Sequence, residues 1–140
     1  MPISVLVLVF SAAAAADAVG AGQKPRADLN VTEILSLDLR GDTSRAIKGY
    51  DEIYPFLVLE RIRPPATEGD PPRLINVWKL SEMTGGGSFD RALEGDEISG
   101  MKWRGEALEF VRTVQSRKQS CRISRITEAK PFVSCQPAKR

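Results

Sequence analysis

The chemistry open to this chain is limited by what it lacks. Its 140 residues include no histidine, so a serine or cysteine nucleophile has no imidazole base of the usual kind. Serine–lysine pairs remain, but neither Ser81 nor Ser120 stands in a spacing that marks one. The acidic residues leave an enzyme that works by carboxylates alone as an alternative. We therefore expect a protein that acts by binding and assign no catalytic residue.

Two segments resemble ligand loops in composition only. Glu94, Asp96 and Glu97 offer carboxylate oxygens, but the alternating acids of a calcium loop and its closing glutamate are absent. The glycines at 85–87 follow an expected strand, yet no Lys-Ser or Lys-Thr pair and no helix pattern comes after them. We expect a solvated acidic turn and a flexible connection, with no metal ion and no cofactor.

The two cysteines, Cys121 and Cys135, predict one disulfide. An even number of cysteines in an exported chain favours a bridge, and the missing histidines disfavour a metal site or a catalytic thiol. The bridge would close a loop of about 15 residues and should stabilise the fold by about 3 kcal/mol.

Charge is distributed unevenly. Residues 101–140 hold ten basic and three acidic residues, whereas residues 27–100 hold fourteen acidic and eight basic ones. One interpretation is a cationic face that contacts an anionic lipid, a glycan or an acidic protein. The other is that acidic and basic strands are neighbours in one sheet and neutralise each other. On the first interpretation the ligand-binding residues are Trp103, as apolar anchor, with Arg104, Arg117, Lys118, Arg122 and Arg125.

Alternating apolar and polar residues predict a mostly β protein. The expected strands cover 31–39, 56–62, 74–80, 98–103, 108–114, 121–126 and 130–135, with a helix as the competing interpretation near 107–114. If residue 121 faces 135, then Ile123 faces Val133 and the turn centres on Glu128. Residues 43–54 are ambiguous and could form a helical turn or two. We expect a small antiparallel barrel or sandwich with a C-terminal hairpin pinned by the disulfide.

The N-terminus predicts export. Residues 1–18 combine a short apolar run with small residues, which is typical of a signal peptide, although no basic residue precedes the run. A buried N-terminal helix or an uncleaved anchor is the alternative. Residues 19–28 would then be a flexible leader and 29–140 a single β-rich domain that is secreted or periplasmic. We expect no membrane span after cleavage and no nucleic-acid partner. Inhibition of an extracellular hydrolase by the proline-rich loop 64–72 is the alternative function.

Overall fold

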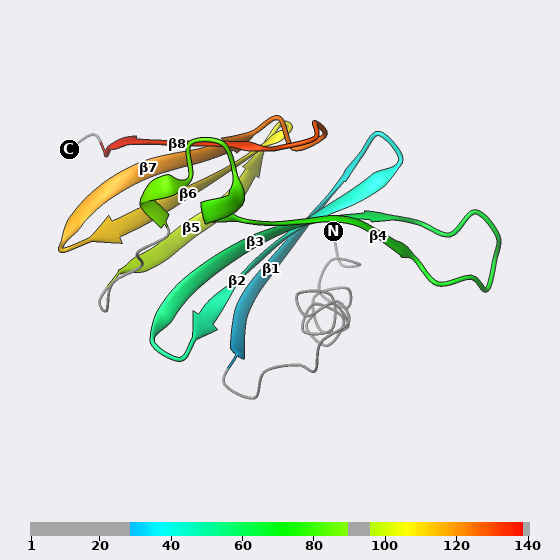
Figure 1. The fold of residues 1–140 in the computed structure, drawn as a ribbon, viewed down its shortest axis with the longest axis horizontal. Coiled ribbons are helices and arrows are strands. Elements are labelled where there is room, and N and C mark those ends of the chain that lie inside the picture. The colour runs from blue at the N-terminus through cyan, green and yellow to red at the C-terminus, as the bar shows by residue number, and fades with distance from the viewer. Residues whose placement is uncertain (1–28, 90–95, 139–140) are drawn as a thin grey trace.

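The computed structural model describes residues 29–89 and 96–138, which form two four-stranded antiparallel sheets (Figure 1). The predicted signal peptide and leader lie outside the described residues, as does Glu94. Each sheet is a meander in which strands that are consecutive in sequence are neighbours in space. Only hairpins are therefore needed to build either sheet, and the chain passes once from the first sheet to the second.

Sheet A contains the first four strands. They are β1 (Leu29–Leu39), β2 (Asp42–Asp51), β3 (Tyr54–Arg63) and β4 (Arg73–Lys79). The β1–β2 turn has positive φ at both central residues, Arg40 (53°) and Gly41 (83°), as a two-residue hairpin turn requires. Residues 64–72 join β3 to β4, are exposed throughout, and extend well away from the rest of the molecule (Figure 1).

Sheet B contains the last four strands. They are β5 (Glu97–Arg104), β6 (Ala107–Val114), β7 (Arg117–Ser124) and β8 (Phe132–Pro137). Two short 3-10 helices, η1 (Leu80–Glu82) and η2 (Gly87–Phe89), belong to the connection between the sheets. This connection is tied to β8, because the Thr84 amide donates to the Pro131 carbonyl (2.9 Å) and the Val133 amide donates to the Thr84 carbonyl (2.9 Å).

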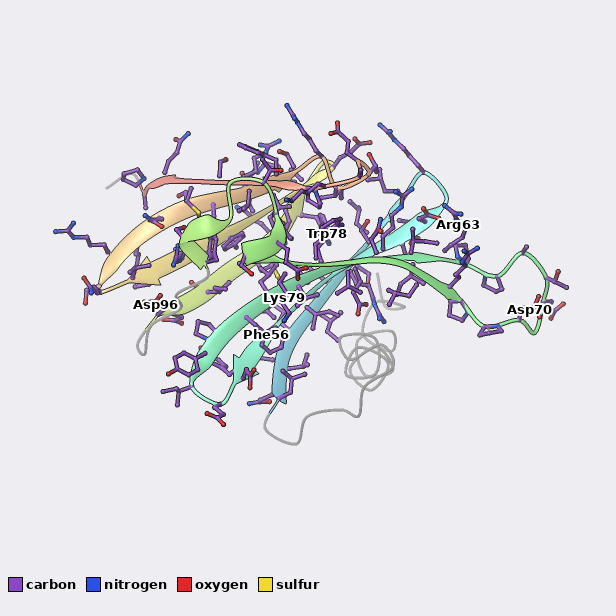
Figure 2. All side chains as sticks on the ribbon, in the orientation of Figure 1. Phe56, Arg63, Asp70, Trp78, Lys79 and Asp96 are labelled. Carbon is purple, nitrogen blue, oxygen red and sulfur yellow. A yellow bond between two sulfur atoms is a disulfide. The ribbon has the colours of Figure 1, made fainter. Side chains whose placement is uncertain are left out.

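The main core lies between the two sheets. Cross-strand partners share a face of a sheet, and Ala46 is aligned with Leu59 and Trp78 on the face of sheet A that turns toward sheet B. Figure 2 shows Trp78 on this side of β4. Sheet B, η1 and Met83 complete the cluster with Ile98, Met101, Leu108, Phe110, Cys121, Ile123, Val133 and Leu80. We call this side of each sheet its inner face and the opposite side its outer face.

Register shifts occur at three places in the two sheets. Thr32 is the extra residue of β1 opposite β2, Ile75 is the extra residue of β4 opposite β3, and β5 gains one residue between Ser99 and Lys102 opposite β6. Such bulges bend a strand and interrupt its ladder of hydrogen bonds.

The predicted fold class is confirmed, and the architecture is the sandwich, because the barrel is not closed. The disulfide joins Cys121 to Cys135 in the register predicted for the last hairpin, with Ile123 opposite Val133. Residues 43–51 form no helical turn and belong to β2. The flexible connection expected at 84–88 is in part regular, since η2 begins at Gly87.

Candidate functional site

The outer face of sheet B carries a row of charged side chains across three strands. Lys102 of β5, Glu109 of β6 and Arg122 of β7 are cross-strand partners and therefore lie side by side. The Arg104 guanidinium donates from Nε to Glu109 Oε1 at 2.6 Å. This hydrogen bond, with the positive charges of Arg104, Lys102 and Arg122, lowers the pKa of the Glu109 carboxyl. One acidic residue is thus surrounded by three basic ones.

A hollow of about 210 Å³ opens beside this row, where the β5–β6 turn meets the end of β7. Its lining is mostly polar and includes two arginines, Arg122 of β7 and Arg125 directly after β7. The lining residues are Glu106, Ala107, Arg122, Ser124, Arg125, Ile126 and Thr127. Guanidinium groups and hydroxyls are donors that suit a carboxylate, sulfate or phosphate oxygen.

The wall of the hollow after β7 is fixed by local structure. Arg125 has a positive φ of 56°, which turns the chain out of the strand, and its guanidinium lies 5.9 Å from the centre of the Phe132 ring. Ile126 is buried in the core, and the Thr127 carbonyl accepts a hydrogen bond from Arg61 Nη1 at 3.2 Å. The loop that follows β7 and lines the hollow is therefore hydrogen-bonded to sheet A through Arg61 of β3.

Asp42 binds Arg61, the arginine that donates to the Thr127 carbonyl. Its carboxylate accepts hydrogen bonds from Arg63 Nε (3.1 Å) and Arg61 Nε (2.6 Å). These contacts, led by the hydrogen bond from Arg63, lower the pKa of Asp42 although burial opposes the shift. On the other side of the hollow, Glu106 lies 3.7 Å from Arg40, and both side chains are exposed. This second pair contributes little to stability, because exposed ion pairs are worth at most about 1 kcal/mol.

The structure does not bring the six predicted ligand-binding residues together at one place. Arg122 and Arg125 line the hollow, and Arg104 lies on the same outer face but is bonded to Glu109. Arg117 and Lys118 are exposed at the opposite end of β7, about 17 Å and about 13 Å from Arg122 at the usual rise of a strand. They are not brought together with the hollow.

Trp103 lies on the other face of the sheet. It pairs with Leu108 on the inner face, packs against the main core, and is half-buried. Its Nε1 is buried and finds no hydrogen-bond acceptor among the described residues. Trp103 is therefore not placed beside Arg104 and Arg122 as a shared ligand surface would require.

Arg112 belongs to the basic C-terminal part of the sequence but is buried. Its Nη1 donates to Ser88 Oγ (3.0 Å), its Nη2 donates to the Ser88 carbonyl (2.9 Å), and its guanidinium lies 4.2 Å from the centre of the Phe89 ring. Asp96 Oδ2 lies 3.8 Å from Nη2. Burial lowers the pKa of Arg112 from its ordinary value. This side chain fastens the connection between the sheets and is not part of a surface.

The basic and acidic parts of the chain do not neutralise each other strand by strand. In the described part of the chain, no strand of sheet A pairs with a strand of sheet B. Residues 29–79 hold eight acidic and seven basic residues and are nearly balanced. The acidic excess found in the sequence comes from residues 82–97, and the basic excess belongs to sheet B.

Other kinds of site find no support in the described residues. They contain no group of three or more histidine, cysteine, aspartate or glutamate side chains that could hold a metal ion. Among residues 29–89 and 96–138, no helix is long and apolar enough to cross a membrane. No protein-family model, curated protein or solved structure matches this chain.

Proposed function

We propose that this is a small exported binding protein that holds an anionic group of a glycan, a lipid headgroup or an acidic protein in the hollow beside β7. One observation supports this above all. Arg122 and Arg125 line the same hollow, both are exposed, and neither has a carboxylate within ion-pair distance among the described residues. Two exposed guanidinium groups that form no ion pair with a described carboxylate favour an external anion, although the charge of Arg122 also acts on its cross-strand partner Glu109.

The neighbouring groups suit the same ligand. Ser124 and Thr127 offer hydroxyl donors within the lining, and Glu106 would disfavour a second negative charge close to the β5–β6 turn. An exposed site of this kind gives modest affinity that weakens as salt is added. Export is supported by the disulfide, since bridges persist in oxidising compartments.

Charge reversal at the hollow tests the proposal. Retention of the protein would be measured on an immobilised sulfated polysaccharide and on vesicles with anionic phospholipid, at low and high salt. Because a hydrogen bond to a charged group is worth about 1.5 to 3 kcal/mol, Arg122→Glu with Arg125→Glu should weaken binding by at least about tenfold. Arg117→Glu with Lys118→Glu is the matched control at the far end of β7. Equal weakening by both pairs would show that net charge and not the hollow is responsible.

The projecting loop supports a second candidate function. Residues 64–72 are exposed over their whole length, with Arg63 at the base and Asp70 near the tip of the arm (Figure 2). An exposed loop on a rigid hairpin is the kind of element with which inhibitors enter a hydrolase cleft. An inhibitor should co-purify with one hydrolase, and a short turn in place of 64–72 should abolish that association while the disulfide still forms. Persistent association without the loop would eliminate this candidate.

A further inference from the structure

The loop 64–72 and the two strand ends that carry it form a projecting arm, which we define as residues 63–73. The strands β3 and β4 are paired as far as Arg63 and Arg73, and every residue of the arm is exposed. The arm points away from both sheets (Figure 1). Its whole surface is therefore accessible to another molecule.

The shape of the arm is fixed by its sequence. Four of the nine loop residues, at 64, 65, 71 and 72, are prolines, and each ring holds its own φ near about −65°. At the tip, the Asp70 amide donates to the Thr67 carbonyl at 3.1 Å, and Gly69 has a φ of 92°, which the third residue of a type II turn adopts. An arm that is already ordered loses little conformational entropy when it binds.

The base of the arm has an excess of positive charge. Arg63 and Arg73 are cross-strand partners, an arrangement that is unfavourable for like charges. Arg61 lies next to them on β3, and Asp42 pairs with Arg61 (2.6 Å) and with Arg63 (3.1 Å). Arg73 forms no ion pair within the described part of the chain. Three arginines against one aspartate leave a net charge of +2, which favours an anionic partner.

The tip of the arm has the opposite charge. Glu68 and Asp70 are both exposed, and neither forms an ion pair within residues 29–89 and 96–138. Figure 2 shows Asp70 at the far end of the arm from Arg63. Five residues of extended chain separate Arg63 from Glu68, a span of about 16 Å. Because salt screens exposed charges beyond about 8 Å, the acids at the tip do not neutralise the arginines of their own arm.

A positive base and a negative tip make the arm complementary to a second arm that runs antiparallel to it. Each tip then lies on the base of the other molecule, and the prolines between the two ends lie against each other. Self-complementarity of this kind is what a twofold contact between identical chains requires. We propose that two copies of this protein associate through antiparallel arms, with Glu68 and Asp70 of each copy against the basic arm base of the other.

The contact is a weak one. The arm contributes eleven residues, whereas a stable interface takes about 20 to 30 residues from each partner. Its charges are exposed, so added salt weakens it further. The inference concerns the arm alone. It depends neither on the hollow beside β7 nor on inhibition of a hydrolase, so the proposed function can fail without it, and the reverse.

Sedimentation equilibrium of the described domain in its full chain tests the inference. Over protein concentrations from about 10 μM to about 1 mM, the mean mass should rise toward that of a dimer at low salt and return toward that of a monomer at high salt. Glu68→Lys with Asp70→Lys should raise the dissociation constant of the dimer at least about tenfold. Glu52→Lys with Glu97→Lys is the matched control, because it changes the net charge equally at exposed positions outside the arm and should retain the dimer.

A mixing experiment assigns the contact to tip and base. Arg73→Glu removes the excess charge of the base and should also weaken the dimer when tested alone. An equimolar mixture of this variant with the Glu68→Lys, Asp70→Lys variant should form more dimer than either variant alone. The acidic tip of one then meets the unaltered base of the other, and a merely misfolded arm would show no such rescue.

Five results would overturn the inference. They are a natural chain that stays monomeric at low salt, a dimer that persists in Glu68→Lys with Asp70→Lys, and equal loss of the dimer in the matched control. Absence of rescue on mixing would show that the tip does not contact the base. A dimer lost in Arg122→Glu with Arg125→Glu but kept in Arg73→Glu would place the tip in the hollow.

Discussion

The disulfide offers the most quantitative prediction about this fold. Cys121 and Cys135 are separated by 14 positions in the sequence and face each other across β7 and β8. Reduction opens a loop of about 15 residues, whose closure is worth about 3 kcal/mol in the chain-entropy model. That corresponds to a loss of about 100-fold in the folding equilibrium constant. For a domain of about 110 residues the melting temperature should fall by roughly 13 °C.

Two ways of removing the disulfide distinguish the loss of the covalent link from the loss of the sulfur atoms. Reduction of the natural chain removes the covalent link and keeps both sulfur atoms in place. Substitution of both cysteines by alanine also removes the volume of the sulfur of Cys121, a residue that is 3% exposed and belongs to the main core. The substituted chain should therefore be less stable than the reduced chain, by about 1 kcal/mol for a cavity of that size.

Urea unfolding, followed by far-ultraviolet circular dichroism, measures both differences at one pH. The slope against urea should rise when the bridge is lost, because a chain without a cross-link exposes more surface on unfolding. Equal urea midpoints for the oxidised and reduced chains would refute the entropic argument. Two free thiols in the unreduced protein, seen by mass, would refute the bridge itself.

Three further predictions follow from buried groups. Arg45 of β2 and Glu60 of β3 form a buried ion pair. Glu60→Leu leaves the Arg45 charge buried without a partner and should cost about 3 to 5 kcal/mol in the free energy of unfolding. A loss below about 1 kcal/mol would mean that the pair is solvated. The pKa of Asp42 is below its ordinary 3.8 in the folded protein, so its contribution to stability is complete above 3.8 and is lost as pH falls through the lowered value. Asp42→Asn should therefore flatten the loss of urea resistance that occurs as pH falls below about 4, and an unchanged loss of urea resistance in acid would contradict this. Gly86→Ala would place a Cβ 1.9 Å from the Leu80 carbonyl oxygen and should cost about 1 to 3 kcal/mol or more, while Gly87→Ala meets no atom within 4 Å and should be nearly neutral in the same assay.

The strands that the sequence predicted well are those with one buried face. In β1 and in the β7–β8 hairpin, apolar and polar residues alternate, and the cysteines fix the register of the hairpin. In contrast, β2 is central in sheet A and is buried on both faces from Ser44 to Ile47. Its sequence has no alternation and includes Arg45 and Gly49, so a period-two search cannot find it.

The candidate site was predictable only in part. Neighbouring residues of a strand point to opposite faces. If residues 98–103 form a strand that continues to 104, Trp103 shares a face with neither Lys102 nor Arg104. The distance between Arg117 and Arg122 follows from the same geometry. The hollow itself could not be foreseen, because it forms where the β5–β6 turn, the end of β7 and the following loop meet. Their meeting depends on tertiary packing.

The bulges in the two meanders have a consequence for self-association. An open sandwich leaves four edge strands, here β1, β4, β5 and β8, and each exposes backbone groups that could pair with another molecule. Every register shift places its extra residue on one of these edges, in β1, β4 and β5. The remaining edge, β8, is six residues long and ends in Pro137, which has no amide hydrogen to donate. Each open edge of the sandwich is thus bulged or short, which protects this small protein from edge-to-edge aggregation.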